Sequence, residues 1–168
     1  MFKTFDGTTF GAETAVPVSF QNLDTPGAAV LNNILYVFCR GPGSDEPGNS
    51  HRFWFAAHDA NLWQGAIVPN TPGCIGNPGA AVFEQKMYVL HQAPNSQFLY
   101  KTYNGQAWSP DASVPNTSGI SAGPAAVAFS MWSVPGLCNL VIRVPGPARG
   151  RDESLGLLAA RPQVVGAG

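Results

Sequence analysis

Two stretches, FWFAAHDANLW at residues 53–63 and FLYKTYNGQAW at residues 98–108, align with each other without a gap. Each begins with an aromatic strand, continues into a polar turn and ends on tryptophan. The N-terminal sequence FDGTTF, at residues 5–10, fits the turn and the closing aromatic position of the same pattern. A motif that returns in order along one chain is the signature of a tandem-repeat fold.

Three further motifs surround these stretches in a fixed order: a Pro-Gly-Ala-Ala-Val or Pro-Ala-Ala-Val segment, an apolar strand with a tyrosine, and a Val-Pro pair. They lie at residues 26–30, 78–82 and 124–127, at 35–38 and 87–90, and at 16–17, 68–69 and 114–115. The repeat unit therefore spans 46 to 52 residues, and the repeats cover residues 1–129.

Each complete unit holds four short strand candidates, which in the second unit lie near residues 78–83, 86–91, 97–103 and 106–109. Asn104-Gly105 predicts a two-residue hairpin turn, because both residues tolerate the positive φ that such a turn needs. Four antiparallel strands in 40 to 50 residues are typical of a β-propeller blade. A Greek-key sandwich is the alternative, but it does not explain the internal identity.

The sequence thus predicts an all-β fold, an incomplete β-propeller of four-stranded antiparallel blades. We expect a half blade at 1–17, blades at 18–69 and 70–115, and the start of another at 116–129. Propellers close with about four to eight blades. We therefore expect either a fragment of a longer protein or a homo-oligomer whose copies complete a ring.

Residues 130–168 depart from the pattern, and we expect an aberrant, irregular tail there. All 18 aromatic residues lie at or before Trp132, and the remainder is rich in Gly, Ala, Arg and Pro. Two explanations stay open: a natural disordered tail, and a reading-frame shift in the gene. One shifted reading of residues 151–168 can spell a further aromatic strand, His-Asp turn and closing Trp.

The charge and hydrophobicity of the sequence exclude two classes of partner. A net charge of −1 with nine Lys and Arg leaves no basic surface for nucleic acid, and no apolar run is long enough to span a membrane. The three cysteines, of which Cys39 and Cys74 lie within the repeats, suit neither a disulfide framework nor a zinc site, so we expect buried thiols. We expect no metal and no cofactor. This chain shows no signal peptide, but a fragment would have lost any signal of its parent protein, so the compartment stays open and includes secretion as part of a longer protein.

Trp63 and Trp108 occupy one repeat position, which Phe10 shares. A repeated aromatic residue in a propeller packs between blades, or it offers a platform on which the apolar face of a sugar stacks. Both interpretations stay open.

His91-Gln92 follows a buried strand and aligns with Cys39-Arg40. Arg40, His91 and Gln92 provide the donors and acceptors that sugar hydroxyls need, so they suit a pocket rim; the alternative is a solvated loop. Trp54 and Tyr100 lie on the adjacent strand and are expected to flank that pocket.

Catalysis is not favoured. Asp6 and Asp59 recur at the hairpin turn, where their side chains bond their own backbone. A residue present for turn chemistry in each unit is a poor candidate for a single catalytic acid or base. No pattern of a two-carboxylate glycosidase is present.

The segment TFDGTTF at residues 4–10 is similar to the Asp-box hairpin of sialidase-type propellers, although it is one residue short between Asp and Gly. The whole unit resembles the tandem repeats of bacterial and fungal β-propeller lectins. That resemblance implies a non-catalytic, carbohydrate-binding module with several sugar sites in or between blades, and a glycan or glycoconjugate as partner. A structural or protein-interaction propeller fragment is the alternative. A sialidase-like glycosidase would need an arginine cluster, but four of the six arginines lie in the tail.

Overall fold

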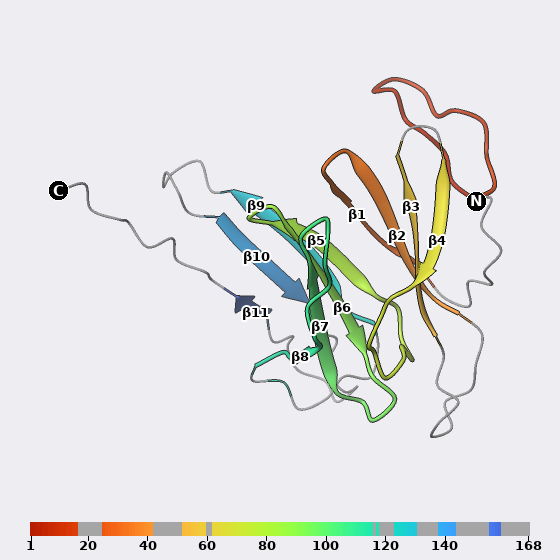
Figure 1. Ribbon diagram of the computed structural model, residues 1–168. Coiled ribbons are helices and arrows are strands. Elements are labelled where there is room, and N and C mark those ends of the chain that lie inside the picture. Colours follow the sequence, from red (N-terminus) through yellow and green to blue (C-terminus); the bar gives the residue numbers. More distant parts are fainter. Residues whose placement is uncertain are drawn as a thin grey trace, which may run out of the picture.

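The computed structural model describes residues 1–16, 25–41, 52–59, 62–115, 117, 123–130, 138–143 and 155–158, and no helix occurs among them. No described helix could therefore cross a membrane. The strands form three antiparallel sheets (Figure 1). Their bounds are β1 (Gly27–Leu31), β2 (Ile34–Arg40), β3 (Phe53–His58) and β4 (Trp63–Ile67); β5 (Gly79–Phe83), β6 (Lys86–Gln92), β7 (Phe98–Tyr103) and β8 (Ala112–Ser113); and β9 (Ala125–Ser130), β10 (Cys138–Arg143) and β11 (Leu155–Leu158).

The first two sheets have the same plan, with strand orders β1-β2-β3-β4 and β5-β6-β7-β8. Their registers also agree, since Ala29 pairs with Tyr36 in the first sheet and Ala81 with Tyr88 in the second. The third sheet has the order β11-β10-β9. The described sheets do not close into a ring, and the predicted fold class, an all-β incomplete propeller, is confirmed.

The sheets fan out side by side, with β5 between β1 and β9 (Figure 1). Glycine makes this close approach possible at the start of two inner strands. A Cβ on Gly79 would lie 2.7 Å from the carbonyl oxygen of Pro124, and a Cβ on Gly27 would collide with the carbonyl oxygen of Pro78. Both obstacles are backbone atoms, so a side chain there would push neighbouring blades apart.

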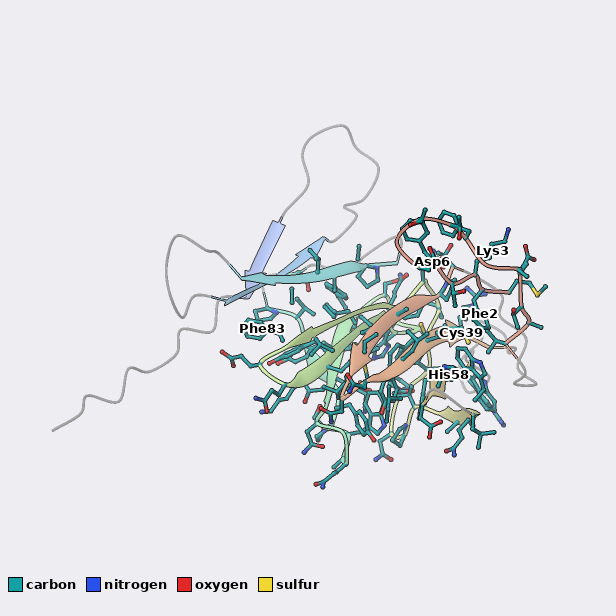
Figure 2. The ribbon with its side chains drawn as sticks, turned by 90° about the horizontal axis from the view of Figure 1, so that it is seen from above. Phe2, Lys3, Asp6, Cys39, His58 and Phe83 are labelled. Atoms are coloured by element: carbon teal, nitrogen blue, oxygen red, sulfur yellow. The ribbon has the colours of Figure 1, made fainter. Side chains whose placement is uncertain are left out.

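Two apolar cores lie between the sheets, because alternate strand residues point to opposite faces. The core between the first two sheets includes Phe38, Phe53 and Met87, each fully buried. The core between the second and third sheets includes Phe83 and Leu90. Figure 2 shows Phe83 on the side of β9, well away from Cys39 and His58.

The turns correct one prediction. Tyr103 pairs with Trp108, so the predicted two-residue turn at Asn104-Gly105 is a four-residue turn. The Asn104 side chain stabilises the wider turn: its Oδ1 accepts bonds from the backbone N–H groups of Gln106 (2.9 Å) and Ala107 (2.8 Å). Asp6 makes the corresponding bonds to Thr8 and Thr9, as the sequence predicts for a residue with turn chemistry.

The two-residue turns with positive φ lie elsewhere, at Asn32-Asn33 and Glu84-Gln85, between the first two strands of each blade. Glu and Gln rarely adopt positive φ, so the second of these turns carries no sequence signal. Its conformation is imposed by the two strands that it joins.

The predicted fourth strand at 106–109 is also misplaced, because β8 forms at Ala112–Ser113. The N–H of Ser109 donates to the carbonyl of Thr102, and the Ser109 hydroxyl oxygen accepts a bond from the N–H of Thr102. The next residue, Pro110, has no N–H to donate to the sheet. The chain therefore leaves the sheet after Trp108 and rejoins it two residues beyond Pro110.

The tail contains regular structure that its composition did not predict. Strands β10 and β11 extend the sheet that β9 begins, with β10 paired to β9 from Cys138–Ser130 to Arg143–Ala125. The rest of the tail, on which the disorder and frame-shift hypotheses mainly depend, lies outside the described residues. So do residues 17–24 and 116, and with them two of the predicted blade boundaries.

Candidate functional site

The Val-Pro motif marks the point where the chain leaves the fourth strand of each blade. The N–H of Val68 donates to the carbonyl of Phe53 (2.8 Å), and the N–H of Val114 donates to that of Phe98 (2.9 Å). The identity continues for two residues in the sequence, since Asn-Thr follows at 70–71 and at 116–117. This Val-Pro-Asn-Thr repeat is a signal that sequence analysis missed.

A pocket lies at each Val-Pro-Asn-Thr motif. The first pocket, of about 550 Å³, is lined by Phe53 and by the connector from Ile67 to Gly73, with Arg52 and Asn95 among its other lining residues. The second pocket, of about 360 Å³, is lined in the corresponding way by Phe98 and Val114. Both volumes lie within the range of small-molecule sites.

The two pockets are equivalent in the repeat and alike in burial. In each, the aromatic residue and the valine are buried, the threonine is half-buried, and the residue before the aromatic is exposed. The corresponding pairs are Phe53 and Phe98, Val68 and Val114, Thr71 and Thr117, and Arg52 and Gln97.

Polar groups surround these apolar floors. Arg52 and Gln97 are exposed side chains that can donate hydrogen bonds to a ligand, and Gln97 can also accept them. The Thr117 hydroxyl donates to the carbonyl of Val114 (2.8 Å), which leaves its oxygen able to accept. An apolar floor with hydroxyl, amide and guanidinium groups at its rim matches a ligand that has apolar and hydroxylated faces.

A buried charged cluster holds the wall of the first pocket. The Lys101 ammonium donates to the carbonyl of Asn70 (2.9 Å) and lies 3.4 Å from Asp111 Oδ1. His91 Nε2 lies 3.2 Å from the same Asp111 oxygen. Lys101 and His91 are both fully buried. His91 therefore belongs to the packing between blades, and its Nδ1 has no hydrogen-bond partner among the described residues.

Arg40 and Gln92 hold the same connector farther along. Arg40 Nη1 donates to the carbonyl of Ile75 (2.7 Å), and the N–H of Ile75 donates to the carbonyl of Gln92 (3.0 Å). Gln92 is buried and Arg40 half-buried.

The repeated tryptophans each pair with a ring across the hairpin. His58 and Trp63 have centroids 4.7 Å apart, as do Tyr103 and Trp108. Trp108 also packs on Phe55 of the preceding blade, at 5.8 Å. Trp108 therefore packs between the two blades.

Phe10 repeats the pairing at the N-terminal hairpin, with its centroid 4.8 Å from that of Phe5. It is 71% exposed, since no described blade lies on that side.

Trp54 and Tyr100 lie apart from each other and from His91. Trp54 pairs with Cys39 and packs against the backbone at Gly41, on the face of the first blade that is turned away from the second. Tyr100 stacks on Tyr88, toward β9. The structure therefore does not bring the seven sequence-predicted residues to one pocket, and none of them lines the first or the second pocket.

A third pocket, of about 270 Å³, is aromatic. Its lining includes Tyr36, Phe55, Tyr103, Asp59 and Gln64. Burial raises the pKa of Tyr36, and the nearby Tyr103 raises it further. This cluster joins two blades, and sequence analysis did not single it out.

Cys39 and Cys74, the cysteines of the repeats, are buried thiols, as predicted. Burial, with a smaller contribution from Cys74, raises the pKa of Cys39 to about 12. The described residues hold no group of three His, Cys, Asp or Glu side chains that could bind a metal ion.

No protein-family model and no curated protein matches this sequence. Solved structures do. A fucose lectin from Kordia zhangzhouensis, in complex with methyl-fucoside, aligns over 77% of this chain and 97% of its own, with a TM-score of 0.54 and 13% identity. The chain shares its propeller-like fold with that lectin.

Two hydrolases align less closely. A GH62 hydrolase in complex with xylotriose has a TM-score of 0.48 and 18% identity, over 75% of this chain and 44% of its own. A glycosyl hydrolase from Bacteroides ovatus has a TM-score of 0.45 and 16% identity, over 80% and 51%. The chain spans about half the length of these hydrolases.

Proposed function

We propose that this protein is a non-catalytic, lectin-like carbohydrate-binding module that takes sugar residues into the first and second pockets. The observation that carries the proposal is the recurrence of one pocket at equivalent positions of successive blades. A binder gains from repeated sites because several contacts to one glycan add avidity. An enzyme instead needs a single arrangement of catalytic groups.

The chemistry of both pockets supports a hydroxylated ligand. Phe53 and Phe98 provide apolar floors, while Thr71 and Thr117 place a hydroxyl at each wall. Sugars combine an apolar ring face with hydroxyls that donate and accept hydrogen bonds. The shared fold with a fucose lectin is consistent with this proposal, although a fold alone does not define a ligand.

A glycan array followed by calorimetry tests the proposal. Thr71→Val and Thr117→Val each remove one hydroxyl while keeping the side-chain shape. Loss of one hydrogen bond to the ligand costs about 0.5–1.5 kcal/mol, so each variant should weaken binding by about two- to tenfold. Thr8→Val is a matched control, because Thr8 is exposed in the N-terminal hairpin and lines neither pocket.

Two results would contradict the proposal. One is a folded protein that binds no glycan on the array. The other is glycan binding that survives in the double variant Thr71→Val/Thr117→Val with unchanged affinity, which would place the site elsewhere.

The sequence-predicted set, Trp54, Trp63, His91, Gln92, Tyr100, Trp108 and Arg40, remains a separate site proposal. Trp108 is its best-placed member, since it packs on Phe55 and Tyr103 beside the third pocket. If sugars stack there, Trp108→Leu should weaken binding in the folded protein while Thr71→Val does not. The opposite pattern would support the first pocket.

We also propose that copies of this chain, or further blades, cover its two open faces. Val30 on β1 is 57% exposed and Val127 on β9 is 55% exposed. The equivalent residues of β5, the strand that lies between β1 and β9, pack in the cores against the neighbouring sheets. Light scattering at several concentrations tests for self-association. A monodisperse monomer throughout would argue against copies.

A further inference from the structure

The first and second pockets meet at one residue. Asn95 lines both of them, and it lies in the short loop between β6 and β7. Pro94, on one side of Asn95, faces the first pocket, while Ser96 and Gln97, on the other side, face the second. The loop therefore forms a ridge between two adjoining pockets.

Hydrogen bonds define the shape of this ridge. The N–H of Ala93 donates to the carbonyl of Gln97 and the N–H of Ser96 to the carbonyl of Ala93, both at 2.9 Å. Asn95 Oδ1 accepts a bond from the N–H of Gln97 (3.2 Å). The N–H groups of the Asn95 side-chain amide make no hydrogen bond to the described residues, so they are available to a ligand. An exposed donor thus stands on a tightly folded ridge.

We propose that a single extended oligosaccharide occupies both pockets, crossing the ridge at Asn95. The inference rests on the proposed function and defines its ligand class as a linear glycan of several units, in place of isolated terminal sugars. Each pocket lies within the size range of drug-sized ligands, so the two together accommodate more than one sugar unit. The Asn95 amide donates to a hydroxyl or ring oxygen of the unit that crosses.

The two ends of such a site differ in charge. Arg52 is the charged side chain that lines the first pocket, whereas the equivalent residue of the second pocket is the neutral Gln97. A chain with distinguishable ends therefore binds in one preferred direction, since only one end meets a cation.

The experiment is calorimetry with a linear oligosaccharide series, from one to six units, of the sugar type that gives a signal on the array. We expect one oligosaccharide per protein chain and an affinity that rises by tenfold or more once the ligand spans both pockets, since linked contacts raise affinity. Asn95→Ala should weaken the longest ligand by about three- to tenfold and leave the monosaccharide unchanged.

Two further variants keep the test informative. Asn95→Asp retains the acceptor that holds the loop and removes the amide donor, so it should weaken the long ligand even if Asn95→Ala unfolds the loop. Gln106→Ala is the control, because Gln106 is an exposed turn residue outside both pockets.

Independent binding of two monosaccharides per chain, with no gain from ligand length and no effect of Asn95→Asp, would overturn the extended-ligand inference. It would leave the proposed function intact. Absence of binding by any sugar would overturn both.

Discussion

Lys101→Met tests whether the buried charged cluster serves stability and the first pocket together. The substitution keeps the length of the side chain and removes its charge, which severs the 2.9 Å bond to Asn70 and the 3.4 Å contact with Asp111. A hydrogen bond from a charged donor contributes about 1.5–3 kcal/mol. Asn70 is exposed and its carbonyl can be hydrated, while Asp111 keeps His91 as a partner.

The substitution also brings a gain in stability, because methionine does not carry the desolvation cost of a fully buried ammonium. We expect the loss to exceed the gain, with a net destabilisation of about 1–3 kcal/mol. For a chain of this length, that lowers Tm by roughly 2–12 °C. Urea unfolding measures the change. In the same variant the Asn70 connector loses its anchor, so binding at the first pocket should weaken more than binding at the second.

The double variant Lys101→Met/Asp111→Asn is the control, because it removes both members of the pair. It should recover part of the stability that the single variant loses, since no carboxylate is left without its ammonium. If Lys101→Met is more stable than the natural protein, desolvation dominates the cluster. If Lys101→Met leaves sugar affinity unchanged, the cluster does not position the first pocket.

Three other perturbations have definite expected outcomes. Gly79→Ala should cost about 1–3 kcal/mol in urea unfolding, because its Cβ meets the Pro124 carbonyl; a neutral effect would show that the blades can separate there. Trp108→Ala should cost about 2–4 kcal/mol, since the half-buried ring packs between blades, and unchanged stability would favour a ligand platform instead. Cys39 should resist thiol reagents at pH 8 in the native protein and react in urea. Because its pKa is raised, stability should fall as pH rises from about 9 toward 12, and Cys39→Ala should lessen that fall.

Local patterns in the sequence were sufficient to predict the blades. The repeated motifs and their spacing predict the strands that became β1 to β3 and β5 to β7, because each motif recurs in the same order in both units. Asp6 was correctly interpreted as a turn residue whose side chain bonds to nearby backbone. Asn104 lies in a turn as predicted, but it stabilises a wider turn by the same kind of side-chain bonds and does not adopt the predicted positive φ. The position of β8 could not be predicted in this way, because Ser109 and Pro110 change which residue rejoins the sheet.

The candidate site depended on contacts between blades. His91 looks in the sequence like a polar residue at a strand end, but neighbouring sheets bury it against Asp111. The two pockets likewise combine a strand end, a connector and a loop that are distant in sequence. The sequence by itself therefore determined the order of the repeated strands and the turn that Asp6 stabilises, since the Asp6 side chain bonds to backbone within three residues. Only the tertiary structure decided which side chains line a pocket and which are buried, because that depends on how one blade packs against the next.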